Sequence, residues 1–94
     1  MRLIWSAPAL DDLRGIDDWL TREASAGVAL RNLAAIRFRA KFLQDFPRGG
    51  RPLQNGQRVL VVYDTPYLIR YQIIDRVVSV VRVHHEREGW LLDP

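Results

Sequence analysis

Cysteine is absent from this chain of 94 residues, and that absence excludes several classes of site. A disulfide framework, a thiolate zinc site and a cysteine nucleophile all require a residue type that the chain lacks. Long apolar runs are absent too, since none approaches the roughly 18 residues of a membrane-spanning helix. The first ten residues are typical of a strand and carry no cleavable signal pattern. We therefore expect a cytoplasmic protein without a membrane anchor.

Hydrophobic residues make up 48% of the chain and charged residues 27%, which is ordinary for a folded protein. Ninety-four residues are enough for one hydrophobic core but short of a second. No repeat, linker or low-complexity segment divides the sequence. We therefore expect residues 1–94 to form a single domain.

Acidic residues are nearly missing from the middle of the chain. Residues 24–63 contain seven basic side chains and one acid, Asp45, for a net charge of +6. Such a stripe can attract phosphates or an acidic partner, although a solvated helix face explains it equally well. The basic residues are Arg31, Arg37, Arg39, Lys41, Arg48, Arg51 and Arg58.

The segment 67–90 has the pattern of a β-hairpin with a charged end. Apolar and polar residues alternate from Leu68 to Ile73, and β-branched residues fill the return strand. A turn at Asp75-Arg76 would place most titratable side chains of the hairpin near its open end. The expected register pairs Ile73 with Val78, Tyr71 with Val80, and Ile69 with Arg82.

Two helices are expected between a first strand, Arg2 to Trp5, and the rest of the sheet. Ser6 is a suitable N-cap for a helix ending near Arg22, and Ser25 for a longer one reaching about Asp45. Apolar residues at helical spacing define one core stripe on each: Ala9, Leu13, Ile16 and Leu20, then Ala29, Leu33, Ile36, Ala40 and Leu43.

A second apolar line on the longer helix contains Phe38 and Phe42, roughly 120–150° away from its core stripe. These rings either complete the core or form a surface for a partner. Pro47 ends the helix, a polar loop follows, and a strand is expected from Gln57 to Tyr63. The predicted order is strand, helix, helix, strand, strand, strand. That order indicates an α+β fold with a helical hairpin packed on a mostly antiparallel sheet.

Chemistry is most plausible at the end of the last strand, which contains the only two histidines. Adjacent strand residues point to opposite faces, so His84 and His85 cannot ligate one metal ion, and no metal or cofactor is expected. Metal-independent RNA cleavage needs a base, cations at the phosphate and an acid, and Arg82, His84 or His85, and Arg87 have the required types. Ion pairing with nearby glutamates is the structural alternative.

Four motifs in order resemble the RelE/ParE superfamily of toxins from type II toxin–antitoxin modules. They are WSAPALDDLRGIDDWL, FPRGGRP, PYLIRYQI and VVRVHHERE, and together they span nearly the whole chain. The resemblance is closest to the ParE branch, whose members poison DNA gyrase, whereas RelE-like members are ribosome-dependent mRNA endonucleases. An arginine that RelE-like toxins commonly carry corresponds here to Leu68, and Lys41 is the only lysine.

The resemblance implies a gyrase inhibitor, rather than an enzyme, that a ParD-like or similar cognate antitoxin neutralises in a hetero-oligomeric complex. A RelE-like endonuclease, or a non-toxic member that only binds antitoxin, remains the alternative. The expected target-binding residues are Arg82, His84, His85, Arg87 and Trp90; the first four are also the catalytic candidates of an endonuclease. The expected antitoxin-binding residues are Trp19, Arg31, Phe38, Arg39 and Phe42.

Overall fold

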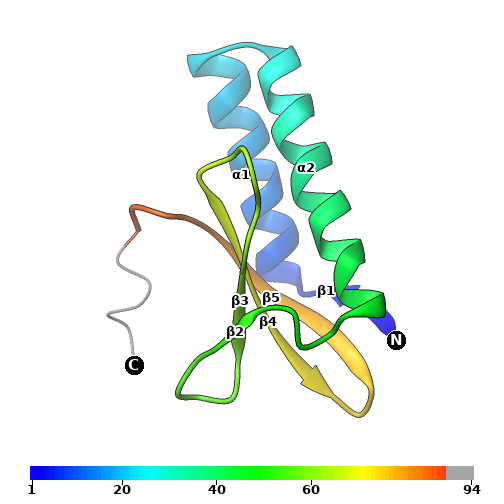
Figure 1. The fold of residues 1–94 in the computed structure, drawn as a ribbon. Helices are drawn as coiled ribbons and strands as arrows, with labels where there is room; N and C mark the ends of the chain where they lie inside the picture. Colours follow the sequence, from blue (N-terminus) through cyan, green and yellow to red (C-terminus); the bar gives the residue numbers. More distant parts are fainter. Residues whose placement is uncertain (89–94) are drawn as a thin grey trace.

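In a computed structural model, which describes residues 1–88, two helices pack against one face of a five-stranded sheet (Figure 1). The strand order is β1-β5-β4-β3-β2, and every neighbouring pair is antiparallel except the parallel pair β1 and β5. The α+β class and the helical hairpin are as predicted. The elements are β1 (Arg2–Trp5), α1 (Ala7–Glu23), α2 (Ala26–Asp45), β2 (Arg51–Pro52), β3 (Arg58–Val61), β4 (Tyr67–Ile74) and β5 (Val77–His85).

Both helices begin at the predicted serine caps. The Ser6 hydroxyl accepts a hydrogen bond from the Ala9 N–H, and the Ser25 hydroxyl accepts one from the Val28 N–H, each at 3.1 Å. No helix within residues 1–88 is long and apolar enough to cross a membrane. The predicted core stripes are confirmed: Ala9, Leu13, Leu20, Ala29, Ile36, Ala40 and Leu43 are buried, with Ile16 and Leu33 partly buried against them.

The hairpin of β4 and β5 turns at Asp75 and Arg76, which both have positive φ angles, 51° and 62°. Two positive φ angles match the twist of a tight hairpin. The predicted register is correct near this turn, where Ile73 lies opposite Val78 and Tyr71 opposite Val80.

Beyond Tyr71 the predicted register is wrong by one residue. Ile69 lies opposite Val83 instead of Arg82, because a β-bulge between Arg70 and Tyr71 gives β5 one extra residue, Val81. Arg70 and Arg82 therefore become direct neighbours across the ladder. The bulge thus sets the positions of the charged side chains at the open end of the hairpin.

The polar loop predicted after α2 contains a short edge strand, β2, that the sequence analysis does not predict. The following strand β3 is also shorter than the predicted Gln57–Tyr63. The Tyr71 hydroxyl holds this loop, because it donates to the Pro47 carbonyl and accepts from the Gly50 N–H, both at 2.8 Å. A Cβ atom on Gly50 would lie 2.7 Å from the Tyr71 ring and 2.8 Å from the Val59 carbonyl oxygen, so only glycine fits.

We predict that Tyr71→Phe lowers the free energy of unfolding by about 1–3 kcal/mol, because it leaves the buried Gly50 N–H without its partner. Urea denaturation measures the change. Tyr63→Phe is the matched control, since Tyr63 is 67% exposed and should change stability by less than about 0.5 kcal/mol. Equal losses in the two variants would contradict this account of the loop.

Candidate functional site

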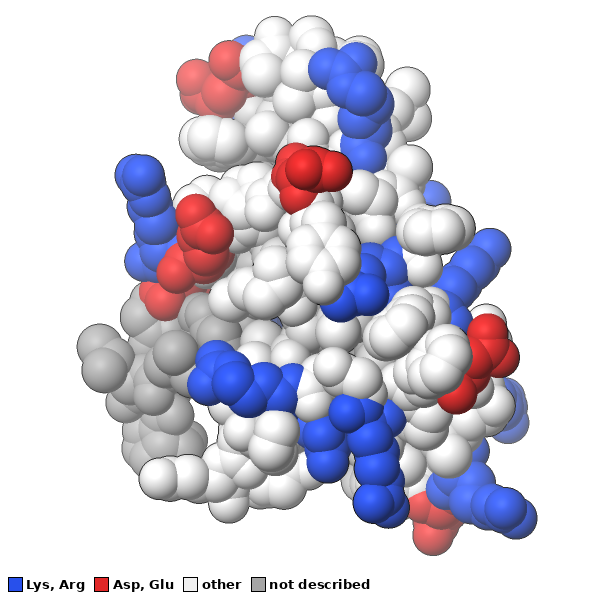
Figure 2. Space-filling model, viewed as in Figure 1, with Lys and Arg blue, Asp and Glu red and all other residues white. Residues whose placement is uncertain are grey.

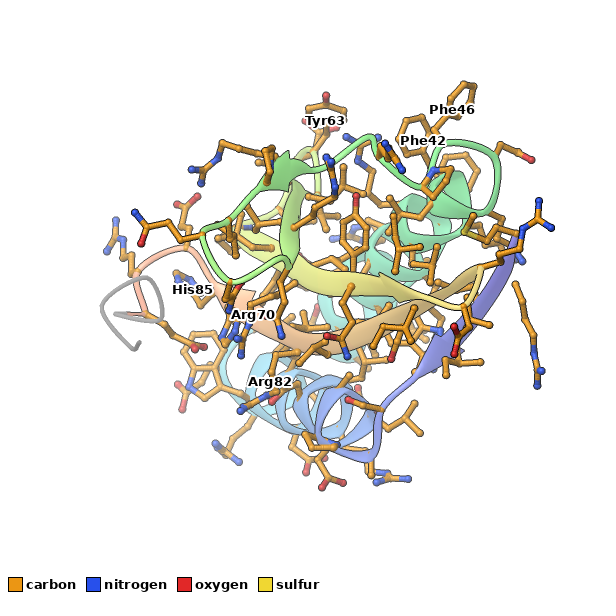
Figure 3. The ribbon with its side chains drawn as sticks, turned by 90° about the horizontal axis from the view of Figure 1, so that it is seen from below. Phe42, Phe46, Tyr63, Arg70, Arg82 and His85 are labelled. Atoms are coloured by element: carbon orange, nitrogen blue, oxygen red, sulfur yellow. The ribbon has the colours of Figure 1, made fainter. Side chains whose placement is uncertain are left out.

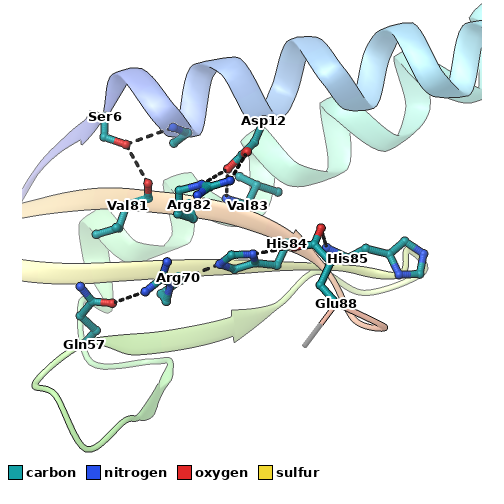
Figure 4. A network of polar contacts seen from close by, with 11 residues as sticks. Ser6, Asp12, Gln57, Arg70, Val81, Arg82, Val83, His84, His85 and Glu88 are labelled. Atoms are coloured by element: carbon teal, nitrogen blue, oxygen red, sulfur yellow. Dashed lines mark hydrogen bonds and ion pairs between the residues drawn. The ribbon is translucent and has the colours of Figure 1, made fainter. Parts of the chain in front are cut away.

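β4 pairs with β5 on one side as far as His85, but on the other side the last part of β5 is bordered by α1 rather than by β1. β1 ends at Trp5, after which Ser6 continues the ladder by donating its N–H to the Val80 carbonyl (3.0 Å) and its hydroxyl to the Val81 carbonyl (2.8 Å). Six residues further along the chain, the Asp12 carboxylate accepts a hydrogen bond from the Val83 N–H at 2.9 Å (Figure 4). Ser6 and Asp12 thus provide hydrogen-bond partners for the backbone groups of β5 that lie beyond the end of β1.

Asp12 also holds Arg82 in place. The Arg82 guanidinium donates from Nε and Nη2 to the two Asp12 carboxylate oxygens at 2.7 and 2.8 Å. Asp12 is only 15% exposed, whereas Arg82 is 41% exposed. Hydrogen bonding to Asp12 raises the pKa of Arg82 above its ordinary value, although burial opposes the change. Arg82 is therefore a fixed cation with one side in water.

A second polar network lies around His84, which is only 5% exposed. The His84 Nε2 accepts a hydrogen bond from Arg70 Nε at 3.2 Å, and Arg70 also donates from Nη1 to the Gln57 side-chain oxygen at 3.1 Å (Figure 4). Because an arginine can only donate, the His84 proton belongs on Nδ1, which lies 2.9 Å from Glu88 Oε2. Both ring nitrogens of His84 are thus engaged within the protein.

Glu88 joins the end of β5 to the turn that follows it. Its Oε1 accepts a hydrogen bond from the His85 N–H at 3.1 Å, while Oε2 contacts His84. Burial alone would raise the pKa of Glu88, but the hydrogen bonds from His85 and His84 outweigh burial and lower it. Glu88 is therefore held as a carboxylate, in the form that fixes the turn.

His85 has a more open position than His84. Its Nδ1 accepts a hydrogen bond from the Arg87 N–H at 3.1 Å, and its ring meets Tyr67 edge-on with a centroid distance of 5.7 Å. Its Nε2 has no hydrogen-bond partner within residues 1–88. A proton-transfer role is therefore easier to assign to His85 than to His84.

Four of the predicted target-binding residues, Arg82, His84, His85 and Arg87, are thus placed around the end of β5. The fifth, Trp90, lies outside the described residues. Sequence reasoning missed Asp12, Gln57 and Arg70, which hold these side chains. Within residues 1–88, no group of three or more His, Cys, Asp or Glu side chains could hold a metal ion.

A second cluster, which we call the aromatic surface, consists of Phe38, Arg39, Phe42, Phe46 and Tyr63. The Arg39 guanidinium lies over the rings of Phe42 and Tyr63, 4.7 and 4.5 Å from their centroids, and its Nε donates to the Val61 carbonyl at 2.9 Å. Phe46 stacks on Phe42 at 4.9 Å, and Phe38 is 79% exposed. Figure 3 shows Phe42, Phe46 and Tyr63 on a different side of the molecule from Arg70, Arg82 and His85.

The other residues predicted to bind antitoxin are distributed differently. Arg31 is exposed on α2, seven residues before Phe38 and thus on the same side of the helix. Trp19 instead lines a pocket with Tyr67, His85 and Glu88 at the other cluster. Two members of the basic stripe, Arg39 and Arg58, donate hydrogen bonds to backbone carbonyls. Figure 2 shows Lys and Arg side chains gathered over the lower part of one face of the molecule.

Comparison with known proteins gives consistent matches over nearly the whole chain. The family model described as "ParE toxin of type II toxin-antitoxin system, parDE" matches residues 3–90. Toxin RelE2 of Caulobacter vibrioides is 34% identical over 84 residues, 89% of this chain and 93% of that protein. Y4kP of Sinorhizobium fredii is 32% identical over 90 residues, 95% of this chain and 92% of that protein. A solved structure, "Chromosomal ParDE TA system from P. aeruginosa", matches with a TM-score of 0.83 and 25% identity over 90% of this chain and 95% of that one.

We predict that Asp12→Ala destabilises the protein by about 1–3 kcal/mol, because it removes a partly buried acceptor of three hydrogen bonds. Asp11→Ala is the control, since the Asp11–Arg14 pair is exposed and worth less than about 1 kcal/mol. Urea denaturation of both variants tests the difference. A loss no larger at Asp12 than at Asp11 would show that the edge of β5 does not depend on this carboxylate.

Proposed function

This chain belongs to the ParE toxin family of type II toxin–antitoxin systems, and from that premise we propose that it inhibits DNA gyrase and that a cognate antitoxin neutralises it. We place this activity in the cytoplasm, where gyrase acts on DNA. The proposal requires a surface that binds the target, without a cofactor and without proton transfer. The end of β5, with Arg82, His85 and Arg87, is the surface that we assign to gyrase.

The state of His84 is the observation that best supports a binding role. A general base must have a ring nitrogen within reach of its substrate. His84 is 5% exposed, and its two nitrogens already contact Arg70 and Glu88. His84 therefore positions Arg70 and the turn at Glu88. This role supports a surface that binds its target through shape and charge.

An mRNA endonuclease is the second candidate, for two specific reasons. The relative from Caulobacter vibrioides has the name Toxin RelE2. In addition, the His85 Nε2 is available for proton transfer, and the partly exposed Arg82 could stabilise a phosphate. General acid–base catalysis contributes about 10²–10⁴ in rate, so an endonuclease that used His85 would lose nearly all activity without it.

We predict that His85→Gln retains toxicity and that the purified protein stabilises cleaved DNA with gyrase while leaving ribosome-bound mRNA intact. His84 is left unchanged because its replacement would also disturb the fold. Expressing the toxin alone, and scoring DNA breaks and the SOS response against loss of translation, separates the two targets. Codon-specific mRNA cuts that disappear in His85→Gln would overturn the gyrase assignment.

The same experiment tests the binding surface. Arg87→Ala should weaken inhibition of gyrase by about tenfold, since a cation in an interface contributes on the order of 1.4 kcal/mol or more. Arg22→Ala is the matched control, because Arg22 is exposed near the end of α1. Equal activity of the two variants would argue against the end of β5 as the gyrase surface.

We assign the antitoxin to the aromatic surface and to neighbouring groups of α2, in a hetero-oligomeric complex. The exposed rings of Phe38, Phe46 and Tyr63 form an apolar area beside a fixed cation, Arg39. Such a mixture of aromatic rings and arginine is typical of protein interfaces. The similar solved structure is a ParDE system, which supports an antitoxin of the ParD kind.

We predict that Phe38→Ala raises the dissociation constant for the antitoxin at least tenfold, because burying such a ring is worth roughly 1.5–3 kcal/mol. Phe38 suits this test better than Phe42, which packs against the core. Leu30→Ala, at a position 69% exposed on the same helix, serves as the control. Calorimetric titration with the antitoxin gives both values. Unchanged affinity in a folded Phe38→Ala variant would move the interface elsewhere.

A further inference from the structure

Three arginines lie in one row across the sheet. Strand pairing places Arg51 of β2 opposite Val59 of β3. Val59 in turn lies opposite Arg70 of β4, which lies opposite Arg82 of β5. Residues directly opposite each other on paired strands share one face of a sheet. Arg51, Arg70 and Arg82 therefore point to the same face, and we call them the arginine row. Neighbouring strands are about 4.8 Å apart, so the row spans roughly 14 Å.

The arginine row lies on the face of the sheet that the helices leave open. Tyr71, the neighbour of Arg70 on β4, is fully buried in the core that the helices cover. Successive strand residues point to opposite faces, so Arg70 points away from the helices. Arg51 is exposed, and Arg70 and Arg82 are partly exposed. The row is therefore accessible to a ligand from solvent.

Arg70 is fixed without a carboxylate partner. It donates to the Gln57 side-chain oxygen at 3.1 Å and to the His84 ring at 3.2 Å (Figure 4). Glu88 contacts the other nitrogen of the His84 ring, and no carboxylate within residues 1–88 forms an ion pair with Arg70. A guanidinium that is held in place but not neutralised is suited to an anion from outside the chain.

The other two members of the row differ from each other in the same respect. Arg82 is paired with Asp12, and its guanidinium keeps one side in water. Arg51 makes no hydrogen bond or ion pair with any residue of the described chain. The row therefore contains three cations and one paired carboxylate, so a ligand that meets it encounters positive charge along its length.

A row of cations is complementary to an anion whose charges repeat along a line, which is the chemistry of a phosphodiester backbone. Proteins that bind single strands also supply aromatic rings on which bases stack. None of the described strand residues that share the open face with the row is Phe, Tyr or Trp. The face thus has the cations that bind a backbone but lacks the rings that bind unpaired bases, which favours a duplex.

We propose that the arginine row binds the phosphodiester backbone of duplex DNA. Arg82 belongs both to the row and to the end of β5, the surface assigned above to gyrase. Because gyrase holds DNA while it cleaves it, a surface that adjoins a gyrase-binding surface has DNA within reach. The choice of DNA rests on the proposed function, whereas the geometry of the row does not.

Titration of a fluorescently labelled DNA duplex with the full chain, followed by anisotropy at several salt concentrations, tests the proposal. The wild type should bind with a dissociation constant on the order of 10⁻⁴–10⁻⁶ M, as non-specific DNA binders do. Arg51→Ala removes an exposed charge and no internal contact. It should weaken binding roughly fivefold to tenfold at about 0.1 M salt and make the slope of log K against log salt shallower by about 0.9. Arg51→Lys retains the charge and should keep the wild-type slope.

Arg37→Ala is the matched control, because it removes the same charge from the groove between the two helices, away from the open face. It should leave the slope unchanged. Equal losses in Arg51→Ala and Arg37→Ala would overturn the proposal, since net charge alone would then explain the binding. Tighter binding to an RNA duplex, or to single-stranded DNA of the same length, would overturn it too.

The titration contains no gyrase, so it separates the arginine row from the proposed function. A wild-type protein that inhibits gyrase but has no affinity for the duplex would overturn the row and leave the gyrase assignment in place. Binding of the duplex through Arg51 by a protein that does not inhibit gyrase would confirm the row and refute the gyrase assignment.

Discussion

The one-residue bulge in β5 is the constraint on which the rest of the site depends. Before it, β5 follows the register set by the turn; after it, Arg82 lies opposite Arg70 on β4. Two guanidinium groups side by side would repel each other without counter-charges. Asp12 binds one of them, while Gln57 and the His84 ring accept hydrogen bonds from the other. The bulge therefore requires partners from α1 and from the loop before β3.

Local patterns in the sequence were sufficient for much of this fold. Ser6 and Ser25 were recognised as caps because capping depends on three or four neighbouring residues. The helical stripes and the turn at Asp75 are equally local. The register was correct as far as Tyr71 and failed beyond it, because one added residue leaves no mark in a run of β-branched side chains. The strand β2 was missed because its two residues lie in a polar loop that Tyr71 holds from a distance.

The candidate site was predicted by residue type but not by arrangement. Arg82, His84 and His85 are conspicuous in the sequence as polar residues at the end of an apolar strand. Asp12 lies 70 positions away from Arg82, and in the sequence it resembles any other acid in the first turns of a helix. Arg70 looked like one member of a strand alternation. Only the three-dimensional register distinguishes His84, which is buried and engaged, from its neighbour His85, whose ring is more open.

The two proposed binding surfaces lie on different sides of the molecule, yet adjacent residues of β4 support them. Successive side chains in a strand point to opposite faces. Tyr71 points toward the loop that follows Phe46 and holds its backbone at Pro47 and Gly50, beside the aromatic surface. Arg70 points the other way and binds His84, which positions the turn at Glu88. Both hydrogen-bond networks, the one around Tyr71 and the one around Arg70, therefore depend on the position of the same strand, β4.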